Sequence, residues 1–257
     1  MVRECRKGSC FIWAILLLLA LQSSPAQGKS LRCSPSLIQI GTFFRGEWVQ
    51  FYGEGPAGSR VVAEVIGEEE NMAFMKKGRL GPIWMNMEEV RFERIPNTYF
   101  LLWSSKSSTA PSKNKMAVID GWGYNYLKTK VKIGGAELDE KEKSRLFDEF
   151  VKLKESERLY GLLPDGVHVE SGNDSIAFKG SFWLPPKISS GDYEVRVYMI
   201  KGEKVAKTAT TEFKVIKVGV PAFLSLLAFQ YEEYYGILAV IVAIAVGFLM
   251  SLAFRRR

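Results

Sequence analysis

The end of the chain carries the feature that most restricts its structure. Residues 236–254 form a run of 19 residues without a charged side chain, and most of them are apolar. A helix that crosses the hydrocarbon core of a bilayer needs about 20 such residues. Because lipid offers no hydrogen bonds to the backbone, a single apolar run of this length can cross only as a helix. We therefore predict a transmembrane helix over residues 235–254.

The residues on either side of this run predict its orientation. Tyr231, Tyr234 and Tyr235 precede it, and the basic tail 255–257 follows it. Tyrosine rings favour the headgroup layer, and arginines are retained on the cytoplasmic side. We expect a single-pass type I protein with its C-terminus in the cytoplasm. Pro221 opens an apolar stretch that predicts a juxtamembrane interfacial helix over residues 220–234, continuing into the span.

Small side chains recur every four residues along the predicted span. They are Ala239, Ala243, Gly247 and Ser251. This spacing places them on one stripe, where the backbone of a second helix can approach closely. The stripe predicts a packing face for a membrane partner or for a second copy of the chain. The alternative is that it reflects only the high frequency of small residues in membrane helices.

The first 26 residues have the pattern of a cleaved secretory signal. A basic start is followed by an 11-residue apolar run, Phe11–Leu21, and Ser24 and Ala26 fit the positions before a cleavage site. The run is too short to span a bilayer. Six of the 35 basic residues and one of the 28 acidic residues lie at the two chain ends, so the body carries a net charge of only +2. We therefore expect an exported body and no nucleic-acid partner.

Two strand-rich segments make up most of the exported body. Short apolar or β-branched runs separated by turn residues predict a first β-sandwich domain over 27–108. Alternation in Gly191–Val197, followed by a hairpin at Lys201–Glu203, resembles the penultimate strand of an immunoglobulin-like domain. That pattern predicts a second β domain over 165–217, which strands from 114–133 would complete. The predicted fold class is therefore mainly β: two immunoglobulin-like or sandwich-like domains, plus the transmembrane helix.

The connecting segment 109–164 contains the pattern of one amphipathic helix. Asp139 and Glu142 have the spacing of a capping pair, and Leu146, Phe150 and Leu153 follow at helical intervals. We predict a helix over about 139–159. Its charged residues alternate in sign, which indicates a solvated face.

Catalytic and metal-binding patterns are missing from the sequence. His168 is the only histidine, and Cys33 is the only cysteine beyond the signal segment. One of each cannot provide the four ligands of a structural zinc site. No phosphate-binding loop, dinucleotide fingerprint or nucleophile elbow occurs. We predict a protein that is not an enzyme and that carries no cofactor.

One cluster of bases is a candidate ligand site. Lys76, Lys77 and Arg79 lie beside glycines, where charge and free backbone N–H groups favour an anion such as sulfite or a phosphate headgroup. Trp84 follows, and it is the tryptophan most suited to a ligand contact. The alternative is a charged hairpin tip that resists edge pairing.

Several motifs along the mature chain give a resemblance to a known family. They are Phe43-Phe44-Arg45-Gly46-Glu47, Phe51-Tyr52-Gly53, the run from Lys76 to Asn86, Val90-Arg91-Phe92, Ile95-Pro96-Asn97-Thr98-Tyr99, Leu184-Pro185, Gly191-Asp192-Tyr193, Lys217-Val218-Gly219, the run from Tyr235 to Val240, and Phe254-Arg255-Arg256. With them the chain resembles the transmembrane proteins first grouped from alphaproteobacteria. In this chain Gly78 and Pro82 interrupt a basic cluster that is fuller in the family.

The resemblance implies a cellular location and an architecture, but it implies no catalysed reaction. It implies a single-pass protein of the bacterial inner membrane with its body in the periplasm, accompanying a multi-spanning permease of the sulfite-exporter kind. Two functions remain open. The first is an accessory or adaptor subunit that docks to a membrane partner. The second is a tethered periplasmic module that binds an anion or a glycan.

Overall fold

The computed structural model describes residues 31–104, 122–135, 138–202 and 204–255. The predicted signal segment, residues 114–121 and the last two arginines lie outside these ranges. Strands predominate, as predicted. They are β1 (Arg32–Ser34), β2 (Leu37–Ile40), β3 (Glu47–Pro56), β4 (Arg60–Ile66), β5 (Glu69–Leu80), β6 (Ile83–Pro96), β7 (Tyr99–Trp103), β8 (Lys132–Gly135), β9 (Tyr160–Pro164), β10 (Val167–Ser171), β11 (Ser175–Leu184), β12 (Gly191–Lys201) and β13 (Lys204–Lys217).

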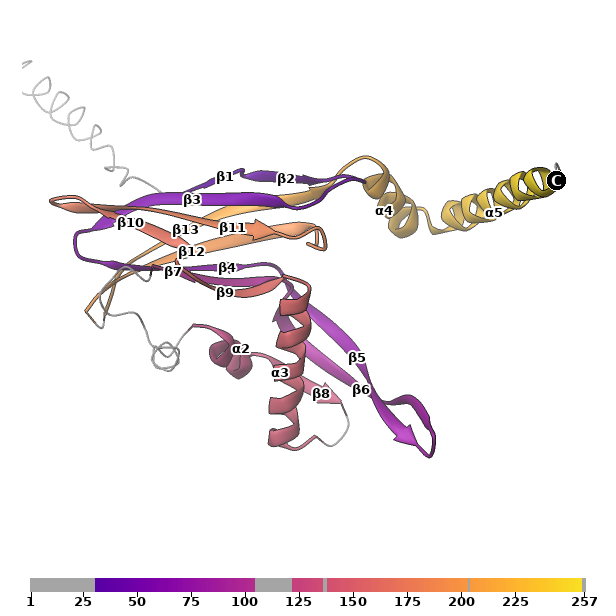
Figure 1. The fold of residues 1–257 in the computed structure, drawn as a ribbon, viewed down its shortest axis with the longest axis horizontal. Coiled ribbons are helices and arrows are strands. Elements are labelled where there is room, and N and C mark those ends of the chain that lie inside the picture. Colours follow the sequence, from indigo (N-terminus) through magenta and orange to yellow (C-terminus); the bar gives the residue numbers. More distant parts are fainter. Residues whose placement is uncertain (1–30, 105–121, 136–137, 203, 256–257) are drawn as a thin grey trace, which may run out of the picture. The chain divides into compact units, whose positions relative to one another are not determined.

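Two of the three sheets pack face to face as a sandwich (Figure 1). One sheet has the strand order β1-β3-β11-β10, and the other has the order β2-β13-β12-β4-β7-β9. Alternate residues of each strand point inward, so aromatic rings of the two sheets meet between them. The ring of Phe182 in β11 lies 5.7 Å from that of Phe100 in β7 and 6.0 Å from that of Phe213 in β13.

The two strand-rich segments share both sheets, which corrects the prediction of separate domains over 27–108 and 165–217. Strand β3 pairs with β11 along ten residues, from Glu47 opposite Leu184 to Pro56 opposite Ser175. Strand β12 lies between β13 and β4, and β2 pairs with β13 in parallel. Each sandwich sheet takes strands from both segments, so the two halves complete one another. The immunoglobulin likeness stays a prediction.

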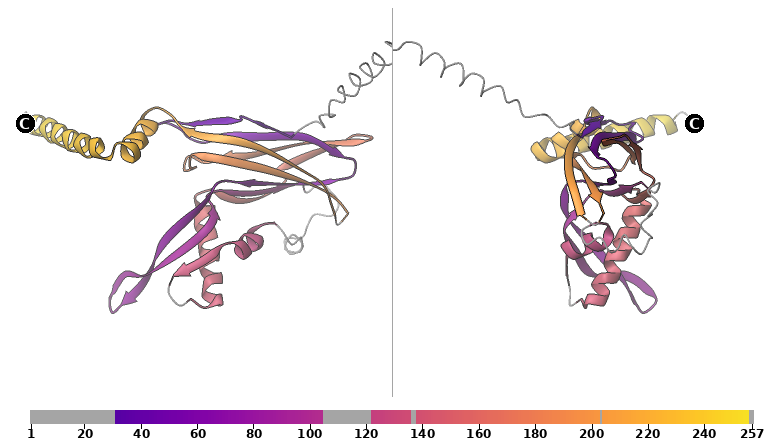
Figure 2. Two further views of the ribbon diagram at one scale, coloured as in Figure 1. Left: turned by 180° about the vertical axis from the view of Figure 1, so that it is seen from behind. Right: turned by 90° about the vertical axis from the view of Figure 1, so that its left-hand side faces the viewer.

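The third sheet, β5-β6-β8, belongs to a smaller layer that also contains helices (Figure 2). The helices are α2 (Tyr124–Lys130) and α3 (Glu140–Ser156). Helix α3 confirms the predicted amphipathic helix, and the side chain of Asp139 accepts a hydrogen bond from the Glu142 N–H at 2.7 Å. In the part of 114–133 that the structure describes, α2 and the start of β8 replace the expected strands, and β8 pairs with β6 outside the sandwich.

A buried carboxylate joins the six-stranded sheet to the start of α2. Glu64 in β4 is only 3% exposed, and its carboxylate accepts hydrogen bonds from the hydroxyls of Tyr99 at 2.8 Å and Tyr198 at 3.3 Å. The Gly123 N–H donates in turn to the Tyr99 hydroxyl at 2.8 Å. Burial raises the pKa of Glu64, while the Tyr99 hydroxyl opposes that rise by donating to the carboxylate.

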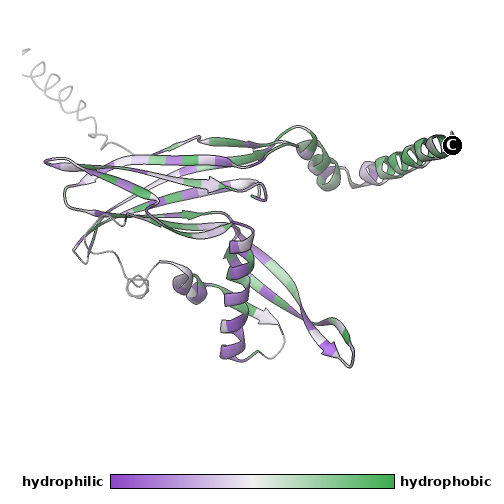
Figure 3. Ribbon diagram, in the orientation of Figure 1, coloured by the Kyte–Doolittle hydropathy of each residue, from purple (hydrophilic) through white to green (hydrophobic). Residues whose placement is uncertain are grey.

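The C-terminal part consists of two apolar helices, α4 (Val220–Gln230) and α5 (Glu232–Arg255) (Figure 3). Residues 233–252 have a mean hydropathy of 2.5, long and apolar enough for the predicted span. The interfacial helix was expected to continue into it. Instead α4 ends at Gln230, and the next residue, Tyr231, has backbone angles of −134° and 57°, outside the helical region. This break separates the juxtamembrane segment from the span.

Candidate functional site

Strands β5 and β6 form a long two-stranded ribbon, and its far end is the candidate site. The strands are joined by a two-residue turn at Gly81 and Pro82, and Leu80 lies opposite Ile83. Gly81 has a φ of 62°, a conformation that costs glycine little and side-chain-bearing residues more. At the ribbon base, Phe92 stacks on Phe150 of α3 with ring centroids 4.9 Å apart. Packing against α3 therefore fixes the base of the ribbon.

Large apolar side chains are exposed toward the end of the ribbon. We call these residues the ribbon tip: Met75 (52% exposed), Ile83 (65%), Trp84 (66%), Met85 (44%) and Met87 (52%). The inward residues Val90 and Phe92, nearer the base, are nearly fully buried. Successive residues of a strand point to opposite faces, so Trp84 lies on one face of the ribbon and Ile83, Met85 and Met87 lie on the other. These exposed apolar side chains make the ribbon tip a candidate interaction surface.

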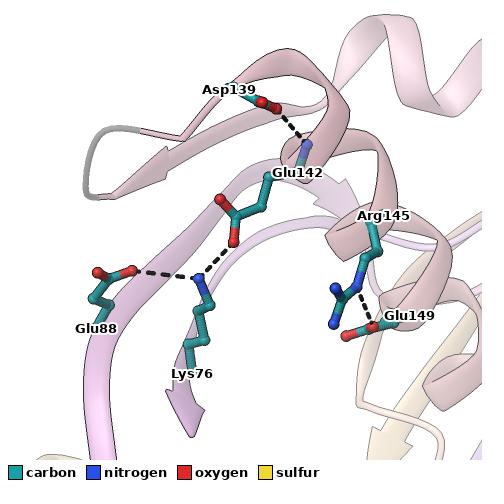
Figure 4. A network of polar contacts seen from close by, with 6 residues as sticks. All are labelled: Lys76, Glu88, Asp139, Glu142, Arg145 and Glu149. Atoms are coloured by element: carbon teal, nitrogen blue, oxygen red, sulfur yellow. Dashed lines mark hydrogen bonds and ion pairs between the residues drawn. The ribbon is translucent and has the colours of Figure 1, made fainter. Parts of the chain in front are cut away.

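A network of ion pairs connects the ribbon to the start of α3 (Figure 4). The Lys76 Nζ donates a hydrogen bond to the Glu142 carboxylate at 2.5 Å and lies 3.6 Å from the Glu88 carboxylate. The bond to Glu142 raises the pKa of Lys76. Arg145, one helical turn further on, pairs with Glu149 at 3.0 Å. Two bases of this region are therefore neutralised by neighbouring carboxylates.

The structure does not bring the three predicted bases to a common point. Lys76 is directed toward α3, whereas the Arg79 Nε donates to the carbonyl of Gly81 at 3.0 Å and ties down the turn. Lys77 borders a groove of about 390 Å³ between the ribbon and α3. The floor of the groove is apolar and includes Phe74 and Leu146. Trp84 lies opposite Arg79 across the ribbon, at its exposed end.

Gly78 interrupts the basic run for a packing reason. The side chain of Met87, in the opposite strand, covers the glycine so closely that a Cβ there would lie 2.4 Å from the Met87 Cγ. A lysine or arginine at position 78 would displace Met87 from the ribbon. No sequence pattern indicates this contact, because it depends on the register between β5 and β6.

The four small residues of the predicted stripe lie on one uninterrupted helix, α5. Ala239, Ala243, Gly247 and Ser251 are all exposed, and a Cβ added at Gly247 would meet no atom within 4 Å. Within the described part of the chain, nothing packs on this stripe. The face is therefore accessible to a second helix.

The described residues contain no group of three or more histidine, cysteine or acidic side chains placed to hold a metal ion. His168 lies exposed on β10. Burial raises the pKa of the half-buried Cys33 thiol to about 11, which keeps it protonated at neutral pH. Cys33 in β1 and His168 in β10 therefore lie on opposite edge strands of the four-stranded sheet.

The comparisons with known proteins give one match. A family model described as "Putative transmembrane protein (Alph_Pro_TM)" matches residues 30–256. No curated protein and no solved structure matches the chain.

Proposed function

Because the chain belongs to this family of transmembrane proteins over residues 30–256, we propose that it is a membrane-anchored, non-enzymatic accessory subunit of a membrane protein complex. The ribbon tip is the observation that carries the proposal. Five large apolar side chains project from a ribbon that α3 holds in place at its base. A rigid apolar projection of this kind is suited to insert into a pocket of a partner.

The proposed cellular location and topology follow from the two ends of the chain. A cleaved signal segment would place the β body in the periplasm, and the arginines after α5 would remain in the cytoplasm. The protein would then be a single-pass component of the bacterial inner membrane. A multi-spanning permease of the sulfite-exporter kind is the partner we propose, with the ribbon tip contacting its periplasmic surface and the α5 stripe contacting one of its helices.

Site-specific photocrosslinking in native membranes tests the ribbon contact. A photoreactive amino acid replaces Trp84, and the matched control carries it at Lys207, an exposed position of β13 on the sandwich. We expect a crosslink to a multi-spanning protein from position 84 and none from position 207. Equal yields from both positions, or a ribbon that crosslinks to no protein, would contradict docking through the ribbon.

Substitutions in α5 test the second contact separately. The pair Ala243→Leu and Gly247→Leu adds bulk to the stripe, whereas Val242→Leu adds bulk at an exposed position away from it. We expect the stripe pair to abolish co-purification of the partner and the control to retain it. If the stripe pair co-purifies the same proteins as the wild type, α5 serves only as a tether.

The alternative function, a tethered module for an anion, has less support at the ribbon. Glu142 and Glu88 neutralise Lys76, and Arg79 is bonded to the turn. An anion would have to compete with these partners. Calorimetry of the full-length protein with sulfite and sulfate tests this alternative, and binding that is lost in Lys77→Ala would favour it over docking.

A further inference from the structure

A second recess lies at an open edge of the sandwich, away from the ribbon. The chain crosses from β9 in the six-stranded sheet to β10 in the four-stranded sheet through Asp165 and Gly166. Strand β10 pairs with β11 only as far as Val167 opposite Gly180, so residues 181–184 of β11 extend beyond it. Because β9 is also an edge strand, the two edges border a cleft of about 700 Å³.

Two tryptophans form one wall of this cleft. Trp48 and Trp183 lie directly opposite each other on β3 and β11, with ring centroids 5.5 Å apart and planes inclined by 64°. The Trp48 ring remains 58% exposed although it borders the cleft. Trp183 is partly buried beside it, and two adjacent indoles of this kind present a large apolar face at low conformational-entropy cost.

The position of Trp183 is fixed by a glycine. Gly46 has a φ of 104°, and a Cβ there would lie 2.4 Å from the Trp183 ring and 2.5 Å from the Leu184 carbonyl oxygen. The Trp183 ring therefore packs directly on the backbone of Gly46, and this contact positions the ring in the ligand-free protein. Preorganisation of this kind reduces the entropy that binding would otherwise cost.

Other residues that line the cleft, which we call its polar wall, carry polar groups of both signs. Glu155, at the end of α3, accepts a hydrogen bond from the Tyr124 hydroxyl at 2.8 Å. Arg158 and Asp165 also line the cleft, and both have positive φ angles, 61° and 63°. Both conformations belong to ordinary turns, since Arg158 follows the C-terminus of α3 and Asp165 lies in the turn between β9 and β10.

We propose that this cleft binds a saccharide. A pyranose ring has an apolar C–H face, which suits the indoles of Trp48 and Trp183, and a rim of hydroxyls, which suits carboxylates and a guanidinium. Acidic and basic groups occur together on the polar wall, which favours a neutral ligand over a strongly charged one. The volume falls within the range of about 300–1,000 Å³ that is usual for small-ligand sites. This site does not depend on the accessory role of the ribbon.

Calorimetry with the full-length protein in lipid nanodiscs tests the proposal, since nanodiscs avoid detergents with sugar headgroups. The probes are three neutral trisaccharides: chitotriose, cellotriose and maltotriose. Trialanine serves as the peptide probe. We expect at least one trisaccharide to bind, and Trp183→Ala to weaken it by about tenfold or more. Trp84→Ala is the control, because it removes an exposed tryptophan that does not line the cleft.

A second variant keeps the result interpretable if Trp183→Ala fails to fold. Ser181→Phe fills the cleft from β11 and leaves both tryptophans in place, and it should abolish the same binding. The proposal is overturned if none of the trisaccharides binds the wild type, or if trialanine binds in their place. It is overturned equally if the cleft variants bind a trisaccharide as tightly as Trp84→Ala does.

Discussion

Replacing Phe150 with alanine should release α3 from the ribbon. The Phe150 ring is 4% exposed, stacks on Phe92 at 4.9 Å, and meets Phe74 and Tyr160 edge-on at 5.9 Å. Truncating a buried phenylalanine costs about 3–5 kcal/mol, and three aromatic contacts place this site no lower than the middle of that range. We expect a loss of about 4 kcal/mol, or roughly a thousandfold in the opening equilibrium of this layer.

Hydrogen exchange of the α3 amides measures this loss directly. Lys152→Ala is the control, because Lys152 is exposed on the same helix and its loss should change stability by about 0.5 kcal/mol at most. If docking needs a fixed ribbon, Phe150→Ala should also reduce the crosslink from position 84. A change in α3 protection below about 1 kcal/mol would show that Phe150 does not hold the ribbon base, and would refute the reasoning.

Three further predictions concern single side chains. Burial raises the pKa of Glu64 in the folded protein above its ordinary value of 4.5, so the native state binds this proton more tightly than the unfolded state does. The stability that this proton contributes is fully present below pH 4.5 and is lost as the pH rises through the pKa of the folded state. Urea unfolding of Glu64→Gln should therefore depend less on pH above 4.5 than unfolding of the wild type, and parallel pH profiles would contradict this. Gly46→Ala should lose about 1–3 kcal/mol and alter the near-ultraviolet circular dichroism of Trp183, because its Cβ would strike that ring; an unchanged spectrum would show that the ring is not held there. Asp139→Ala should lower stability by about 1 kcal/mol through the loss of the α3 cap, whereas Asp139→Ser should retain most of it in thermal unfolding.

Local patterns in the sequence predicted the elements that depend on neighbouring residues. The uncharged run specified α5 because membrane insertion depends on length and composition alone. The Asp139–Glu142 spacing specified the start of α3 because a cap is formed within one turn. The strand content of both segments was likewise predictable from alternation. The break at Tyr231 between α4 and α5 was not, because no proline or glycine marks it.

The candidate sites were predictable only in part. The sequence placed Lys76, Lys77, Arg79 and Trp84 near one turn, but it could not identify Glu142 as a partner of Lys76, 66 residues away. The cleft at Trp48 and Trp183 depends on a pairing between strands 135 residues apart in the chain, so no local pattern could have found it.

Short-range periodicity is enough to predict an apolar helix long enough to cross a membrane, a capped amphipathic helix and many strands in this chain. That the strands on either side of α3 form one sandwich instead of two is visible only in the folded structure. Strands pair in the arrangement that lets their apolar faces exclude water from a shared core. The pairs β3 with β11 and β4 with β12 each join a strand from before α3 to a strand from after it, so they form only when both parts of the chain are present. That choice also created the projecting ribbon and the cleft between the sheet edges.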